Sequence, residues 1–103
     1  MQSTQQPPRR KIPARLEVRY DRAFLVDLKR IERTSRLTIQ QFVFDQFFQL
    51  SYFQELPEFH PIGSSAIYYR FTLQSYLISL EMTGQIVKFL RIIHKPDLNR
   101  QVS

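Results

Sequence analysis

Apolar residues at every second position mark the C-terminal third of the chain as three consecutive strands. In residues 67–73 apolar side chains alternate with more polar ones, and the same period of two returns in residues 76–83. A Gln-Ser pair separates these two runs, and Gly84, a residue that tolerates positive φ, separates the second run from the β-rich run 86–93. The pattern therefore predicts an antiparallel meander.

The first half of the chain shows the pattern of one strand followed by two helices. Residues 16–20 alternate like a strand, and Asp21 then stands where a helix N-cap belongs, because its carboxylate can accept from the free amides of a first turn. Apolar residues recur at helical spacing to about residue 33. A capping-box pattern at residues 38–41 predicts the start of a second helix, which extends to about Leu50.

A loop containing Pro57, Pro61 and Gly63 connects the second helix to the meander. The predicted order is β-α-α-β-β-β. We expect an α+β, two-layer domain in which the first strand joins the meander in one antiparallel sheet and both helices pack on one face as a hairpin. The opposite, more polar face is left free, and function should lie there.

The second predicted helix carries more aromatic surface than one buried face requires. Its apolar stripe is formed by Ile39, Phe42, Val43, Phe47 and Leu50. Phe44 and Phe48 widen this stripe, and Tyr52 and Phe53 follow it. These rings are most simply core, but an exposed remainder would be a surface for a partner.

Composition excludes several classes of site. The chain has 103 residues, enough for one domain, and 43% of them are apolar, enough for a modest core. It has no cysteine, which rules out disulfides, thiolate zinc sites and cysteine nucleophiles, and its two histidines cannot form a conventional zinc site unaided. We expect no metal or cofactor. No apolar run reaches membrane length and the first residues lack the apolar core of a secretory signal, so we expect a cytoplasmic protein that uses no membrane.

The net charge of +6 is concentrated at the N-terminus. Four of the cations, Arg9, Arg10, Lys11 and Arg15, precede the first predicted strand. We therefore divide the chain into a flexible basic arm, residues 1–15, and a folded domain, residues 16–103. The simplest interpretation of the arm is a solubilising tail, and the alternative is a salt-sensitive contact with an RNA or DNA backbone.

Two ordered motifs carry a resemblance to a known family. The first reads Tyr-Arg-x₅-Tyr-x-Ile-x-Leu-Glu from Tyr69, and the second reads Phe-x-Arg-x-x-His-x-x-Asp-x-x-Arg from Phe89. Together they resemble the C-terminal half of toxins of the RelE/ParE superfamily, and residues 16–31 resemble the opening strand and first helix of that family. The resemblance covers residues 16–100 and implies a RelE-like fold.

The resemblance also implies a function. Toxins of this kind belong to type II toxin–antitoxin systems: each is held inactive by a cognate antitoxin, and RelE-like members enter the ribosome and cut mRNA without a metal. Such cleavage needs a base, an acid and cations that neutralise the phosphorane. The implied catalytic residues are Arg70, Arg91, His94 and Lys95, and the implied RNA-binding residues are Tyr69, Arg70, Tyr76, Lys95 and Arg100.

Departures from the family pattern leave the activity open. Leu77 stands where an arginine is usual, Lys95 replaces an arginine, and Asn99 replaces a tyrosine. The Gly-Asp before the middle-strand tyrosine is Gln-Ser here, and His60, Pro61 and Gly63 replace loop lysines. The alternative to a nuclease is therefore a ParE-like toxin directed at gyrase, or a degenerate module that only binds antitoxin.

Each candidate residue also has a purely structural interpretation. His94 can be a hydrogen-bonded histidine at a strand end, Arg70 can pair with Glu81, and the two tyrosines, Tyr69 and Tyr76, can be aromatics at the edge of the core. Arg91 has the parity of the inward residues Val87, Phe89 and Ile93. It must therefore leave the core at the strand end, meet a bulge or pair with a carboxylate, for which we favour Asp97. His60 is given no role.

Overall fold

The computed structural model describes residues 11–13 and 15–97, and the predicted α+β order is confirmed there. The chain runs through β1 (Glu17–Tyr20), α1 (Arg22–Arg30), α2 (Arg33–Phe44), the 3₁₀ turns η1 (Gln46–Gln49) and η2 (Phe53–Glu55), β2 (His60–Pro61), β3 (Tyr68–Leu73), β4 (Tyr76–Thr83) and β5 (Ile86–His94). The short strand β2, within the predicted loop, and the two 3₁₀ turns are additions to the predicted order.

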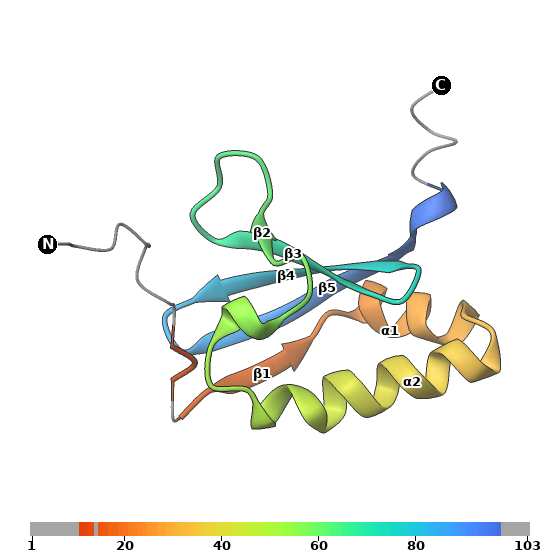
Figure 1. Cartoon of the computed structure of the whole chain (residues 1–103), viewed down its shortest axis with the longest axis horizontal. Coiled ribbons are helices and arrows are strands. Elements are labelled where there is room, and N and C mark those ends of the chain that lie inside the picture. The colour runs from red at the N-terminus through yellow and green to blue at the C-terminus, as the bar shows by residue number, and fades with distance from the viewer. Residues whose placement is uncertain (1–10, 14, 98–103) are drawn as a thin grey trace, which may run out of the picture.

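All five strands form one sheet in the order β1-β5-β4-β3-β2. The pairings β2–β3, β3–β4 and β4–β5 are antiparallel, as a meander requires, whereas β1 pairs with β5 in parallel. Both helices lie together on one side of the sheet (Figure 1). The first strand therefore joins the meander in one sheet as predicted, but the sheet is mixed and not antiparallel throughout as expected.

The core lies between the helices and the inward face of the sheet. It is formed by Phe24, Leu28, Ile39, Val43, Phe47, Phe53, Leu56, Phe71, Ile78, Leu80, Met82, Val87, Phe89 and Ile92. The predicted inward positions Leu28 and Phe71 are both buried, which confirms the stripe of the first helix and the parity of the first meander strand. Phe89 contacts four other aromatic rings, those of Tyr20, Phe24, Phe47 and Phe71.

The N-cap predicted for the first helix is confirmed, but the start of the second helix was predicted wrongly. The carboxylate of Asp21 accepts from the backbone N–H of Ala23 at 3.1 Å. The second helix begins at Arg33, because Glu32 caps it by accepting from the N–H of Ser35 at 2.7 Å. Thr38 lies inside the helix, and its hydroxyl donates to the carbonyl of Thr34. The first helix correspondingly ends at Arg30, three residues earlier than expected.

The aromatic residues of α2 and η1 divide between core and surface. Phe47 is fully buried, because the helix ends at Phe44 and η1 turns the following residues inward. Phe44 and Phe48 remain 43% and 53% exposed. An exposed aromatic remainder therefore exists, as the alternative interpretation required.

No helix within residues 11–13 and 15–97 is both long and apolar enough to span a membrane.

Candidate nucleic-acid interface on the free face of the sheet

A row of polar side chains crosses the sheet on the face turned away from the helices. His60 on β2 pairs with Arg70 on β3, Arg70 pairs with Ser79 on β4, and Ser79 pairs with Arg91 on β5. Directly paired residues of neighbouring strands project to the same face. With strands about 4.8 Å apart, the row is about 14 Å long.

A β-bulge in β5 places Arg91 in this row. Leu80 pairs with Phe89 and Ser79 pairs with Arg91, so that Leu90 is an extra residue between the two pairs. The extra residue turns Arg91 to the free face and Ile92 into the core. Arg91 therefore avoids the core because a bulge shifts the alternation of β5, one of the possibilities that its parity left open.

The carboxylate that holds Arg91 belongs to Asp27 on α1, and the predicted pairing with Asp97 was wrong. Arg91 donates from Nε to Asp27 Oδ2 at 2.7 Å and from Nη2 to Asp27 Oδ1 at 3.1 Å, and the backbone N–H of Ile92 donates to Oδ2 at 2.9 Å. Burial of the Asp27 carboxyl acts to raise its pKa, but the hydrogen bonds from Arg91 and Ile92 and the charge of Arg91 outweigh burial and hold the pKa below its ordinary value. Hydrogen bonding to Asp27 raises the pKa of Arg91. The pair therefore stays ionised at neutral pH and fixes the plane of the guanidinium.

A polar pocket of about 290 Å³ lies at the β2 end of the row. It is lined by Glu58, His60, Arg70, Thr72, Leu77 and Lys95. We call it the polar pocket. It brings a carboxylate, an imidazole, a guanidinium and an ammonium group together at one place on the free face.

Two hydrogen bonds hold the Glu58 carboxylate in the polar pocket. Its Oε1 accepts from the hydroxyl of Thr72 at 2.7 Å and from Nζ of Lys95 at 3.3 Å. The hydrogen bond from Thr72, followed by the hydrogen bond and charge of Lys95, lowers the pKa of Glu58, so this carboxyl is ionised at neutral pH. Its backbone has φ of 52°, a conformation rare for a residue other than glycine.

Arg70 has no carboxylate partner within residues 11–13 and 15–97. The pairing with Glu81 that the sequence allowed is not formed, because Glu81 lies opposite Tyr68 and Lys88 and Arg70 lies opposite Ser79. Arg70 is therefore available to an anion.

The structure separates the predicted site residues into two groups. Arg70 and Lys95 line the polar pocket, and Arg70 and Arg91 line a neighbouring pocket on the same face. His94 lies elsewhere: it pairs with Tyr76, their rings are 4.9 Å apart, and both line a pocket beside α1 with Asp27.

The predicted RNA-binding tyrosines do not lie in the row. Tyr76 and Tyr69 are half-buried and pack against the core, and the ring of Tyr69 stacks on Phe59 at 5.0 Å. Arg100 lies outside the described residues. Among the residues that are described, no cluster of three or more acidic, histidine or cysteine side chains is arranged to hold a metal ion.

The sequence did not single out Glu58 and His60, which line the polar pocket. Both lie in the segment expected to be a connecting loop, and His60 was given no role. Their partners, Thr72 and Lys95 for Glu58 and Arg70 for His60, come from strands later in the chain. Nothing local distinguishes these two residues from ordinary loop residues, and only the pairing of β2 with β3 identifies them.

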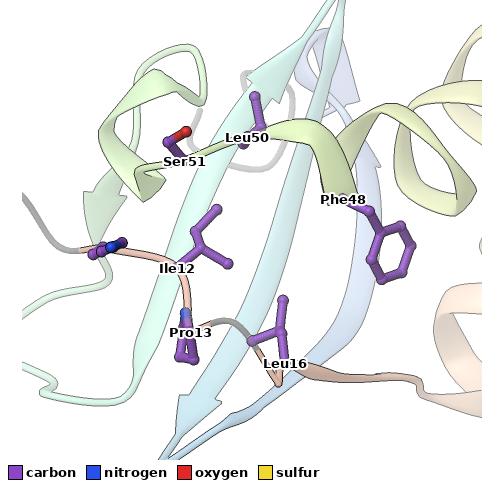
Figure 2. A pocket seen from close by; sticks show the side chains of 7 residues that line it. Ile12, Pro13, Leu16, Phe48, Leu50 and Ser51 are labelled. Atoms are coloured by element: carbon purple, nitrogen blue, oxygen red, sulfur yellow. The ribbon is translucent and has the colours of Figure 1, made fainter.

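A second surface lies away from the free face, where the N-terminal segment meets the residues after α2. Ile12 donates its backbone N–H to the carbonyl of Ser51 at 3.0 Å. Between the two segments is an open groove of about 510 Å³, lined by Lys11, Ile12, Pro13, Leu16, Phe48, Leu50 and Ser51. We call it the N-terminal groove. Figure 2 shows Ile12, Pro13 and Leu16 on one side and the segment from Phe48 to Ser51 on the other.

Comparison with known proteins identifies the fold. No family model matches the chain, and no curated protein sequence is significantly similar to it. The solved RelB–RelE antitoxin–toxin complex of Methanococcus jannaschii contains a chain with 22% identity and a TM-score of 0.64, covering 82% of this chain and 99% of that one. A chain of the RelBE2 toxin–antitoxin complex of Mycobacterium tuberculosis has 17% identity and a TM-score of 0.61, covering 77% and 96%. YafQ from E. coli strain BL21(DE3) has 15% identity and a TM-score of 0.53, covering 82% and 98%. These similarities show a shared fold.

Proposed function

We propose that this chain, which has the fold of RelE and YafQ toxin chains, is the toxin of a type II toxin–antitoxin pair and cleaves mRNA on the ribosome. The observation that carries the proposal is the polar pocket, where Glu58, His60, Arg70 and Lys95 converge on the free face of the sheet. These are the kinds of group that RNA cleavage without a metal requires. An mRNA target places the activity in the cytoplasm.

The polar pocket supplies a role for each of its charged groups. Glu58, ionised at neutral pH, accepts the proton of a ribose 2′-hydroxyl as the 2′-oxygen attacks the adjacent phosphorus. Arg70, without a carboxylate partner in the described part of the chain, neutralises the phosphorane. His60 donates a proton to the departing 5′-oxygen. The products are a 2′,3′-cyclic phosphate and a 5′-hydroxyl end.

Lys95 couples the base to the phosphate. In the free protein its ammonium donates to Glu58. When Glu58 takes up a proton its negative charge is lost and the ion pair weakens, so the charge of Lys95 becomes available to the phosphorane. Arg91, held by Asp27, braces the far end of the row.

The test is primer extension on mRNA after induced expression of the chain and its variants. Arg70→Ala and Glu58→Gln should each reduce cleavage about 10²- to 10⁴-fold, the usual effect of removing one positioned catalytic group. Arg19→Gln is the matched control, because Arg19 is an exposed cation that lines neither pocket of the free face and is paired with Glu17. Full cleavage by Arg70→Ala would reject the polar pocket as the active site.

One observation favours the alternative of a toxin that is not a nuclease. Leu77 lines the polar pocket at a position where the resemblance implies an arginine, which removes one cation from the phosphate site. A ParE-like activity would arrest growth with broken DNA and intact mRNA. A module that only binds antitoxin would cause no arrest. The same induction experiment, with chromosomal DNA examined alongside mRNA, separates the three outcomes.

We further propose that the partner is an antitoxin that covers the N-terminal groove and the exposed rings of Phe44 and Phe48. The RelE chains with the same fold were solved in complexes with antitoxins. The groove is lined mainly by apolar residues, and its one basic residue, Lys11, has no carboxylate partner among the described residues. These features fit a segment that carries apolar and acidic side chains.

Co-expression tests this partner. The product of a small acidic reading frame next to the gene should copurify with the chain and relieve growth arrest. Phe48→Ser should weaken the complex, because it removes an exposed ring from the groove, whereas Leu25→Ser, at an exposed position on α1 outside the groove, should not. Equal binding by both variants would place the antitoxin elsewhere on the molecule.

A further inference from the structure

A second pocket on the free face adjoins the polar pocket and differs from it in character. It has a volume of about 410 Å³ and is lined by Pro61, Ile62, Gly63, Arg70, Leu77, Ser79, Arg91 and Ile93. We call it the apolar pocket. Arg70 and Leu77 line both pockets, so a ligand can span them around a shared cation.

Aliphatic side chains form the base and rim of the apolar pocket. Leu77 on β4 lies directly opposite Ile93 on β5, and both are half-buried on the free face. Ile62, in the segment after β2, is 41% exposed. A solvated phosphate alone gains nothing from these groups, because they offer neither charge nor hydrogen bonds.

Two arginines stand on either side of this aliphatic base. Arg70 and Arg91 both pair with Ser79, so their backbones lie two strand spacings apart, about 9–10 Å. Ser79 between them is small and leaves the space above it open. A flat ring fits between two such side chains, and guanidinium planes are surfaces on which unpaired bases stack.

The two arginines differ in how they are held. Arg91 is fixed by two hydrogen bonds to Asp27 before any ligand arrives, so its plane is already oriented. Arg70 has no carboxylate partner in residues 11–13 and 15–97 and can turn to an anion. One wall is therefore rigid, and the other carries a mobile charge shared with the polar pocket.

We propose that the apolar pocket binds an unpaired nucleobase of single-stranded RNA, with the phosphate of that nucleotide on Arg70. A nucleotide matches the pocket because it joins an apolar planar face to an anion at short range. This inference rests on the proposed function, since it names the part of the substrate that lies beside the cleaved bond. Leu77, which looks like the loss of a phosphate-binding arginine, is the residue that gives the base its apolar support.

The experiment is a titration of the full chain, followed by NMR chemical shifts, with adenosine 5′-monophosphate and with ribose 5-phosphate. Neither probe contains a phosphodiester bond, so cleavage does not interfere. The nucleotide should bind about tenfold more tightly than the sugar phosphate, because the base buries apolar surface against Leu77 and Ile93. The largest additional shifts should fall on residues of the apolar pocket.

Variants test whether the additional affinity for the nucleotide comes from the apolar pocket. Ile62→Ser should reduce nucleotide binding towards the level of ribose 5-phosphate and leave ribose 5-phosphate binding unchanged, because Ile62 lines the apolar pocket and not the polar pocket. Leu77→Ser should also reduce nucleotide binding. Leu25→Ser is the matched control, because the exposed fraction of Leu25, 39%, is similar to the 41% of Ile62. Leu25 lies on α1, away from the free face. Ile62 lies outside the strands, so the comparison survives if Leu77→Ser fails to fold.

Each result has a distinct meaning. Equal binding of the two probes, or nucleotide binding unaffected by Ile62→Ser, would overturn the base subsite and leave the proposed cleavage intact. No binding of either probe would remove the phosphate site on Arg70 and with it the proposed function. Tighter binding of N-acetyl-leucyl-glutamate amide at the same residues would assign the pocket to an acidic peptide and overturn the subsite as well.

Discussion

Asp27 completes the edge of β5 where the neighbouring strand has ended. β1 pairs with β5 only from Ile86 to Phe89. Beyond this point the carboxylate of Asp27 accepts from the backbone N–H of Ile92 and from Arg91, so a side chain of α1 takes the place of a strand. One residue of the helix thereby supports one end of the polar row.

Asp27→Asn should cost about 1–3 kcal/mol of unfolding free energy at pH 7, because it removes charge-assisted hydrogen bonds and leaves Arg91 without its counter-ion. The pKa of Asp27 is lowered by folding, so its contribution is present above the ordinary carboxyl pKa and is lost as the pH falls through the folded-state pKa. Urea unfolding at pH 7 and at pH 3 measures the free energy of unfolding of wild type and variant. The difference between the two free energies should be smaller at pH 3 than at pH 7.

Asp45→Asn is the control for that measurement. The Asp45 side chain makes no capping hydrogen bond, and no ion pair to it is found among the described residues. The free energy of unfolding of Asp45→Asn should equal that of the wild type at both pH values. A deficit in Asp27→Asn that is the same at pH 3 and pH 7 would show that the charge of Asp27 is not the cause.

The two histidines should differ in their importance for cleavage. His60 lines the polar pocket, whereas the ring of His94 packs against that of Tyr76 in a different pocket. His60→Gln should therefore reduce mRNA cleavage about 10²- to 10⁴-fold, and His94→Gln should leave most of it. Primer extension on equal amounts of the two folded variants decides between them. The reverse order of activities would return proton transfer to His94.

At the scale of elements, α1 attaches to the sheet through one apolar stripe. Leu28 is 4% exposed and lies in the core, so Leu28→Ala should cost about 2–5 kcal/mol through lost burial and a residual cavity. Leu25→Ala, on the same helix but outside the core, should cost less than about 1 kcal/mol. Thermal or urea unfolding of both variants provides the measurement. Similar losses would mean that the helix is rotated relative to the structure.

For the whole molecule, charge predicts how RNA binding responds to salt. The logarithm of the affinity for a single-stranded oligoribonucleotide should fall linearly with the logarithm of the salt concentration, with a slope of about −0.7 for each phosphate neutralised. We expect removal of residues 1–10 to leave the slope unchanged, in keeping with a solubilising tail. Fluorescence anisotropy at several salt concentrations measures it. A slope shallower by about 1.4 would show that Arg9 and Arg10 each neutralise a phosphate.

Local patterns along the sequence determined the elements and their inward faces. The period of two in the meander identified the buried Phe71, the helical spacing identified Leu28, and a single carboxylate identified the cap at Asp21. These features depend on neighbours within one or two turns of chain, which is why they can be read without the fold. The start of α2 escaped this reasoning because its first turn is polar and carries no apolar period.

The positions of the candidate site residues are set by contacts between distant segments, which only the tertiary structure shows. The parity of β5 places His94 on the same face as Arg70 when every residue alternates, but the extra residue at Leu90 reverses all later side chains. His94 therefore turns to the helix side, and Arg91 and Lys95 turn to the free face. Asp27 reaches Arg91 across 64 residues of chain, and His60 joins the row only when β2 pairs with β3. Glu58 meets Thr72 and Lys95 across 14 and 37 residues. A bulge and contacts of this length leave no periodic signal, because they arise from how distant segments fit together.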